Sequence, residues 1–410
     1  MRTISIVTAG LALLGLGEVA SANAFLFEFY DAKAVGRGNA SAATDSDPSA
    51  ISYNIGGLAI GRGTTVTVGG SLLMPSASYT DPSGATTHSE ASHPVVPHLF
   101  ASSRMNDLVA IGIGFHAPFG LALSWPDSAP TSDQVKDESV RTFFITPAIG
   151  VDLGKLVPGL TLGAGLDLVP ATLEMTQLLF FGETRGQARL GGSAFGIGGR
   201  LGATYTPEAL PQLSVGAMWR SRVTEDVTGK ADFDVADPYR SQLPPDGDIS
   251  TTFVLPQSVS VGAAYRPSPA LELEADAQWV NWSTLKELRI HMPGGADAAS
   301  PLAGKNTVTF NVGAEYQLAR YHAAVRVGYI YDPTALPATT LGVLLPDISH
   351  HELTGGASYR LGEYDLHLGV LYMLPATRAT AEMPYMPVHK GSYEVQALVT
   401  SLTLDGHFGR

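Results

Sequence analysis

The amino-acid sequence predicts an all-β protein, a 14-stranded antiparallel transmembrane β-barrel with an N-terminal luminal plug. Three observations predict it: polar and apolar residues alternate within many segments, short and long connections alternate between those segments, and an export signal precedes them all. Past that signal, no apolar run approaches the roughly 18 residues of a membrane helix. A chain that enters a membrane without such helices must cross it as strands.

The stretch LELEADAQW, residues 271–279, shows the alternation most clearly. A strand directs successive side chains to opposite faces of its sheet. The apolar face carries Leu271, Leu273, Ala275, Ala277 and Trp279. The polar face carries Glu272, Glu274, Asp276 and Gln278. A barrel wall with lipid on one side and a wet lumen on the other produces this pattern.

About fourteen such segments are long enough to cross a tilted span of roughly 9–11 residues. They lie near 64–80, 94–102, 108–119, 139–151, 160–175, 187–206, 212–230, 251–266, 270–290, 306–318, 321–332, 349–361, 363–374 and 391–408. An even number is expected for a bacterial barrel that closes antiparallel.

The connections between the segments are of two kinds. Short turns alternate with longer polar stretches at 81–93, 120–138, 176–186, 231–250, 291–305, 332–348 and 375–390. Outer-membrane barrels have short turns on the periplasmic side and long loops on the outside. A secreted propeller or sandwich has no reason for this asymmetry, so the alternation favours the barrel.

The N-terminus predicts export. Arg2 precedes an apolar run, and Ala22-Asn23-Ala24 has the small-x-small form of a signal-peptidase site. We therefore expect a signal peptide over residues 1–24 and a mature chain that begins at Phe25; a buried N-terminal helix is the alternative. Residues 25–63 are rich in small residues, Gly and Asp, and we expect them to form the plug of a barrel over 64–410. A periplasmic tail is the alternative for this segment.

Composition excludes several classes of function. The net charge of −13 argues against a nucleic-acid partner, which needs clustered Lys and Arg. The absence of cysteine removes thiolate metal sites and thiol nucleophiles. Adjacent His350 and His351 point to opposite faces of a strand, and the acidic cluster at 45–47 is typical of a solvated turn. We expect no metal, no cofactor and no catalytic residues.

At the N-terminus the chain resembles the FadL-type outer-membrane transporters, the OMPP1/FadL/TodX family of channels for long-chain fatty acids and aromatic hydrocarbons. The stretch AVGRGNASAATDSDPSAISYNIGGLAIG is similar to the family's plug pattern, and Asn54, Gly57 and Leu58 match its motif. Ile55 and Gly56 stand where the family has Pro and Ala. Further similar stretches, such as IGIGFHAPFGLAL and LPQSVSVGAAYRPSPALELEADAQWVNWSTL, follow in the family's order.

The resemblance implies a monomeric barrel in the outer membrane of a Gram-negative cell, in contact with outer-membrane lipid and lipopolysaccharide. It implies a hydrophobic ligand that is captured among outer loops, held beside the plug and released through a lateral opening at a kink in the third strand. That strand contains Gly112, Gly114 and Pro118, which weaken or interrupt a ladder. Glycine packing in a tight barrel is an equal alternative.

Two groups of candidate ligand-binding residues follow. The apolar group comprises Phe25, Phe27, Phe29, Leu178, Phe180, Phe181 and Leu344, which either bind a hydrocarbon or pack loops together. The head-group candidates are Arg200, Arg220 and Arg326, which either hold a carboxylate or pair with luminal acids. The function we expect is passive uptake of long-chain fatty acids or of aromatic or aliphatic hydrocarbons. The alternatives are a structural or adhesive barrel and a barrel lipid esterase.

Overall fold

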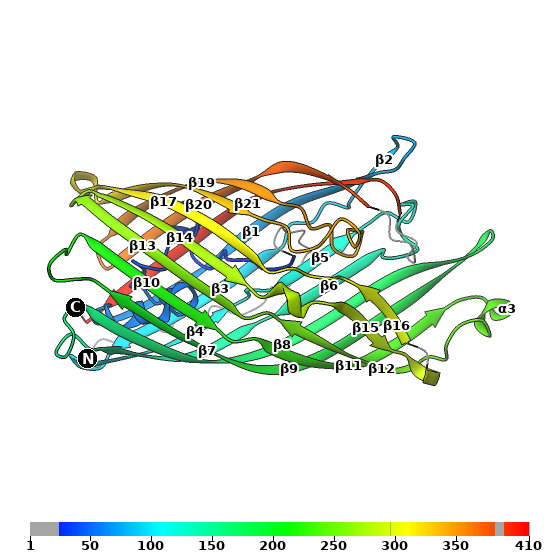
Figure 1. Cartoon of the computed structure of the whole chain (residues 1–410), viewed down its shortest axis with the longest axis horizontal. Helices are drawn as coiled ribbons and strands as arrows, with labels where there is room; N and C mark the ends of the chain where they lie inside the picture. Colours follow the sequence, from blue (N-terminus) through cyan, green and yellow to red (C-terminus); the bar gives the residue numbers. More distant parts are fainter. Residues whose placement is uncertain (1–23, 296, 382–388, 410) are drawn as a thin grey trace, which may run out of the picture.

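The structure is a computed structural model that describes residues 24–295, 297–381 and 389–409. All but the last residue of the expected signal peptide therefore lies outside the described residues. The chain forms a closed antiparallel β-barrel of 14 strands, drawn lengthwise in Figure 1. The predicted fold class is confirmed.

The first half of the wall contains the following strands: β1 (Thr64–Thr80), β2 (Thr86–His88), β3 (Val95–Arg104), β4 (Val109–His116), β5 (Gly120–Ser124), β6 (Asp137–Thr142), β7 (Phe144–Asp152), β8 (Leu160–Phe181), β9 (Thr184–Tyr205), β10 (Leu213–Arg220) and β11 (Val223–Asp234). Several of these are the inner and outer parts of one wall strand, separated by a short break. For example, β4 and β5 together make the third wall strand, and β10 and β11 the seventh.

The second half contains β12 (Gly247–Leu255), β13 (Ser258–Ser268), β14 (Leu271–Val280), β15 (Glu287–His291), β16 (Asp297–Pro301), β17 (Thr307–Leu318), β18 (Ala323–Asp332), β19 (His350–Leu361), β20 (Tyr364–Ala379) and β21 (Ser392–Phe408). Short helical turns occur at α3 (Asp237–Arg240), η2 (Trp282–Thr284), η3 (Pro293–Gly295) and η4 (Ala319–Tyr321). No helix within the described ranges is long and apolar enough to cross a membrane.

The first and last strands close the barrel. β1 pairs with β21 antiparallel without interruption, from Thr64 opposite Phe408 to Thr80 opposite Ser392. Closure gives the backbone N–H and C=O groups of both terminal strands a partner, which a strand in lipid requires because no water is available there.

The two faces of the wall differ as the alternation predicts. On β14, Leu273 is 44% exposed, whereas the side chain of Asp276, three residues on, is buried inside the barrel. Arg200, Arg220 and Arg326 are also buried on the luminal face. Outward-facing residues that are large, apolar and exposed recur on nearly every strand, because lipid rather than protein surrounds them.

The segment expected to form the plug lies inside the barrel. It contains α1 (Ala32–Gly36), α2 (Ala50–Tyr53) and η1 (Ile55–Ala59), and nearly all of its residues are buried. The acidic row of β14 holds it in place: Arg37 pairs with Glu272 at 2.9 Å and with Glu274 at 3.0 Å. Asp276 accepts hydrogen bonds from the N–H groups of Ser41 and Ala42.

The outer connections differ from the sequence prediction at one place. Residues 176–186 were expected to form a long loop, but β8 and β9 continue through them as a hairpin that turns at Gly182 and Glu183. The hairpin projects at the outer end of the barrel in Figure 1. The sequence does not mark this strand, because Leu178–Phe181 is a continuous apolar run without alternation and the turn residues GETRG follow it directly.

Candidate functional site

The third wall strand is interrupted where β4 ends at His116 and β5 begins at Gly120. In the interval the chain pairs with the N-terminal segment instead of the neighbouring wall strand. The N–H of Phe27 donates to the carbonyl of Pro118 at 2.8 Å, and the N–H of Gly120 donates to the carbonyl of Phe25 at 3.0 Å. The N-terminal segment thus replaces part of the wall ladder.

The neighbouring strand, β3, is left with an unpaired stretch. Its ladder with β4 begins at Leu99 opposite Phe115, so residues 95–98 have no ladder partner on that side among the described strands. Pro94 precedes this stretch and Pro97 lies within it, and proline has no N–H to donate to a ladder. Contact with the third strand resumes further out, where the N–H of Glu90 donates to Ser124.

A pocket lies at this interruption, which we call the gap pocket. It encloses about 490 Å³ of space outside the atoms, counting the part that is open to solvent. Its lining includes Phe27, Val96, Pro97, Leu121 and Phe143. The side chains come from both edges of the interruption and from the N-terminal segment, so the pocket lies where the wall ladder is broken.

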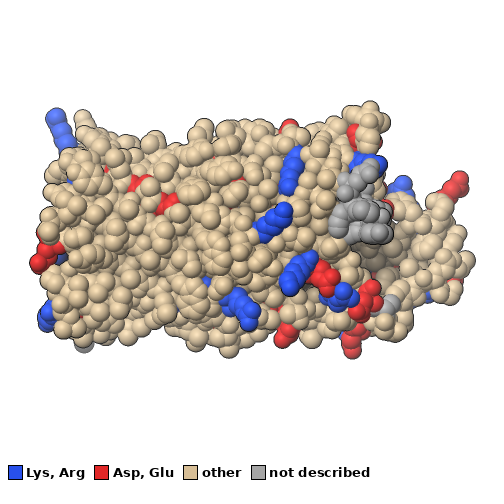
Figure 2. Space-filling model, in the orientation of Figure 1, with Lys and Arg blue, Asp and Glu red and all other residues tan. Residues whose placement is uncertain are grey.

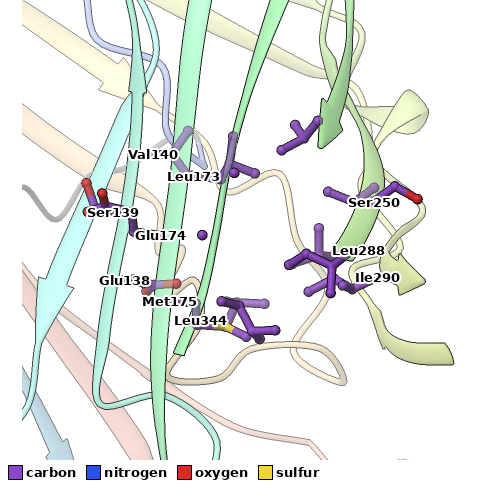
Figure 3. A pocket seen from close by; sticks show the side chains of 16 residues that line it. Glu138, Ser139, Val140, Leu173, Glu174, Met175, Ser250, Leu288, Ile290 and Leu344 are labelled. Atoms are coloured by element: carbon purple, nitrogen blue, oxygen red, sulfur yellow. The ribbon is translucent and has the colours of Figure 1, made fainter. Parts of the chain in front are cut away.

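A second, largely apolar pocket lies further out, and we call it the middle pocket (Figure 3). It encloses about 550 Å³ by the same measure. In Figure 3, Val140 and Leu173 lie on one side of it, Leu288 and Ile290 on the other, and Leu344 at its base. The strands β6, β8, β9, β11, β12 and β15 and the outer connection 333–349 therefore build it together.

The outer pocket is the third and largest, about 1490 Å³ by the same measure. It shares five lining residues with the middle pocket: Met175, Leu190, Leu288, Ile290 and Leu344. The middle pocket in turn shares Ser139 and Val140 with the gap pocket. The three pockets are therefore adjacent in series, from the outer end of the barrel to the interruption in its wall.

An aromatic cluster adjoins this series at the first described residues of the chain. The ring of Phe25 lies 5.8 Å from that of Phe119, 5.2 Å from Phe253 and 5.0 Å from Trp282. Phe119 lies in the interruption itself and forms an isolated bridge with Leu26. The N-terminal segment therefore contributes both backbone and rings at the point where the wall is broken.

The predicted apolar ligand residues occupy four kinds of position. Phe27 lines the gap pocket, and Leu344 lines the middle and outer pockets. Phe25 lies in the aromatic cluster, while Phe29 and Leu178 are buried outside the three pockets. At the hairpin tip, Phe181 stacks on Tyr239 and Phe180 is exposed. Loop packing thus accounts for Phe181, and neither Phe180 nor Phe181 lines a pocket.

The three predicted arginines differ in their partners. Arg200 pairs with Asp167 at 2.7 Å and donates to the carbonyl of Ile51. Arg326 pairs with Glu315 at 2.5 Å. Arg200 and Arg326 are therefore both paired with acidic residues inside the barrel.

Arg220 is different. Its guanidinium lies 4.7 Å from the ring centre of Phe119, and its Nε and Nη2 have no hydrogen-bond partner in the described part of the chain. It lines a polar cavity together with Glu28. Burial raises the pKa of the Glu28 carboxyl, which accepts a hydrogen bond from Gln278.

The motif residues of the N-terminal segment have structural roles. Asn54 donates to the carbonyls of Ala42 and Ala203 and caps η1 through the N–H of Gly56. A Cβ on Gly57 would lie 1.8 Å from the carbonyl oxygen of Asp45, so only glycine fits there. Leu58 is buried against the wall.

The three candidate residues for a lateral opening lie in two different parts of the third wall strand. Gly112 and Gly114 lie in the regularly paired part of β4, where an added Cβ would meet Ile51 of the N-terminal segment. They let that segment approach the wall. Pro118 is the residue of this group that lies in the interruption, where its carbonyl accepts from Phe27.

Two clusters of polar residues inside the barrel differ from what the sequence predicts. Asp45 and Asp47, expected to be solvated, pair with Lys33 inside the barrel. Ser358, His367 and Asp405 form a hydrogen-bonded chain across three strands, with His367 Nδ1 2.5 Å from the Ser358 hydroxyl. Arg326 also donates to that hydroxyl, which ties the chain into the luminal network. No cluster of metal-ligating residues occurs among the residues that the structure describes.

A closed transmembrane barrel with apolar pockets in series and residues 25–63 inside it belongs to the class of outer-membrane channels for hydrophobic compounds. Residues 13–408 match the family described as outer membrane protein transport protein (OMPP1/FadL/TodX), and the chain belongs to that family. Members are transport channels and not enzymes, which excludes the esterase alternative. The protein resides in the outer membrane.

Solved structures share the fold. A FadL homologue of Pseudomonas aeruginosa is 17% identical with a TM-score of 0.84, covering 94% of this chain and 100% of that one. The toluene transporter TodX of Pseudomonas putida is 20% identical with a TM-score of 0.73, covering 93% and 99%. A curated outer membrane protein of Neisseria meningitidis serogroup B is 22% identical, covering 88% of each chain.

Proposed function

We propose that the protein takes up hydrophobic small molecules passively, as a monomer, along the outer, middle and gap pockets. The ligand binds first among the outer connections, passes Leu344 and Val140, and leaves sideways through the interruption between β3 and β5 into the membrane. The single observation that carries this proposal is the sharing of lining residues between successive pockets. Residues 1–24 serve as the signal peptide, and residues 25–63 as the plug that keeps the lumen closed to water-soluble molecules.

The substrate class we propose is long-chain fatty acids or aromatic and aliphatic hydrocarbons, as for the family. Apolar pockets favour a hydrocarbon body because its transfer from water is favourable. Arg220 is the head-group candidate we retain, since two of its nitrogens lack a partner and it lies beside Phe119. If it contacts a carboxylate, Arg220→Leu will slow uptake of oleate and leave uptake of toluene unchanged.

A block at the junction of the middle and gap pockets tests the route. Val140 lines both pockets, so Val140→Trp will fill the passage. We expect uptake of oleate and toluene into vesicles that contain the protein to fall to the level of empty vesicles. Val261→Trp is the matched control, because Val261 is exposed on the lipid face of β13 and a larger ring there meets only lipid. Unchanged uptake by a folded Val140→Trp variant would contradict the route.

A further inference from the structure

Basic side chains on the outer surface of the barrel are concentrated at one depth. In Figure 2, Lys and Arg form a row across the visible face, between the long, mostly uncharged part of the wall and the outer extensions. The chain as a whole carries a net charge of −13, so this concentration of cations runs against the overall charge. It marks a surface that differs chemically from the rest of the wall.

Arg222, Lys286 and Lys305 are three exposed cations at equivalent places in the seventh, ninth and tenth wall strands. Arg222 lies in the break before β11, Lys286 in the break before β15, and Lys305 in the break before β17. We call these three residues the basic band. None of them has an ion-pair partner within the described ranges.

Backbone hydrogen bonds show that the breaks are contiguous. The carbonyl of Lys286 accepts from the N–H groups of Leu302 and Ala303, next to Lys305. The N–H of Asn281 donates to Gln257, and β12 pairs with β11 up to Val223, next to Arg222. The basic band therefore follows one continuous strip of the wall.

The residues on the membrane side of the strip are apolar. Trp219 precedes Arg222 on the same wall strand, and Val308 follows Lys305 towards the membrane; both are exposed. Cations directly beyond lipid-facing side chains lie at the depth of lipid head groups, and an unpaired cation there attracts anionic head groups.

We propose that the basic band binds the phosphate groups of lipids in the outer leaflet of the membrane. Three unpaired cations on one strip match the charge of a phosphorylated lipid, and the adjoining apolar surface accommodates its acyl chains. The binding would hold the barrel at a fixed depth, which keeps the interruption between β3 and β5 beside acyl chains rather than head groups. This inference concerns a lipid partner and is independent of the uptake route proposed above.

Reconstitution of the protein into nanodiscs tests whether the basic band binds lipid phosphate. The mature protein is placed in phosphatidylcholine with and without a small fraction of diphosphorylated lipid A, and retained lipid A is measured by native mass spectrometry. We expect the wild type to retain lipid A and Arg222→Gln/Lys286→Gln/Lys305→Gln to bind it with an affinity lower by on the order of 100-fold. The control Arg62→Gln/Lys155→Gln/Arg320→Gln removes three exposed cations at the opposite end and should match the wild type.

The outcomes are distinct. Loss of retention in the first variant but not in the control supports the proposal. Loss of lipid A retention by the wild type at high salt also supports it. Equal retention by all three proteins overturns it. If the triple variant does not fold, the three single substitutions are measured instead, and each must reduce retention.

Discussion

At the scale of single residues, Arg200 shows how a charge inside the barrel depends on a partner from another strand. Arg200 and Asp167 are almost completely buried and face each other across 2.7 Å. Desolvation of both charges offsets much of their attraction, so the pair contributes little net stability. Loss of one partner is different, because the remaining charge then stays buried without compensation.

Arg200→Met is therefore expected to destabilise the folded barrel by about 3–5 kcal/mol. Chemical unfolding in detergent micelles, followed by tryptophan fluorescence, measures the change. The double variant Arg200→Met/Asp167→Leu should recover most of the loss, since it leaves no unpaired charge.

The exposed pair Arg189–Asp232 provides the control for that experiment. Its atoms are 3.8 Å apart and both side chains are more than half exposed, so Arg189→Met should change stability by less than about 1 kcal/mol. A loss from Arg200→Met as small as that of the control would contradict the account of a buried, uncompensated charge.

At the scale of single elements, the β8–β9 hairpin extends outward, and β11 pairs with β9 as far as Asp234 opposite Gln187. Its strands pair from Leu160 opposite Tyr205 to Phe181 opposite Thr184. The outermost part supplies Leu179 to the outer pocket. Hydrated pairs near a hairpin tip contribute little to the stability of a closed barrel, so this part of the hairpin is expected to serve ligand capture.

Replacing residues 179–186 by Asn-Gly joins Leu178 to Gln187, which are already paired, through a favoured hairpin turn. We expect the unfolding free energy to fall by only about 0.5–1.5 kcal/mol, the contribution of the Phe181–Tyr239 stack that is lost. The initial rate of hydrocarbon uptake into vesicles should fall. A stable variant with the wild-type rate would show that capture does not use the hairpin.

The third wall strand shows what a single sequence reveals at this scale. Gly112, Gly114 and Pro118 mark it as irregular, but composition alone does not say which residue breaks the ladder. The break depends on Phe25 and Phe27, about 90 residues earlier in the sequence, whose backbone takes the place of the neighbouring strand. A pairing between distant segments leaves no periodic signal in either of them.

At the scale of the whole molecule, the N-terminal segment fills a lumen that the wall cannot fill. The diameter of a barrel grows with its number of strands, and fourteen leave space beyond the reach of wall side chains. Deletion of residues 27–59 is expected to convert a closed barrel into a water-filled pore. Single-channel recording in planar bilayers should show a steady ion conductance for the deletion variant and very little for the intact protein.

The deletion variant should still fold, because Glu272, Glu274 and Asp276 would then be hydrated instead of paired. Its heat-modifiable migration on a gel checks this. Equal conductance of the intact and deleted proteins would contradict a plugging role for the segment.

The sequence by itself determined the barrel, its strand positions, the two faces of its wall and the presence of a segment that does not fit as strand. These features are local, since alternation and turn residues record on which side each residue meets water or lipid. Only the tertiary structure decided which arginine has two nitrogens without a hydrogen-bond partner, that the hairpin replaces a loop, and where the pockets meet. Those features arise from contacts between residues far apart in the chain, and such contacts are fixed only when the barrel closes around its own N-terminus.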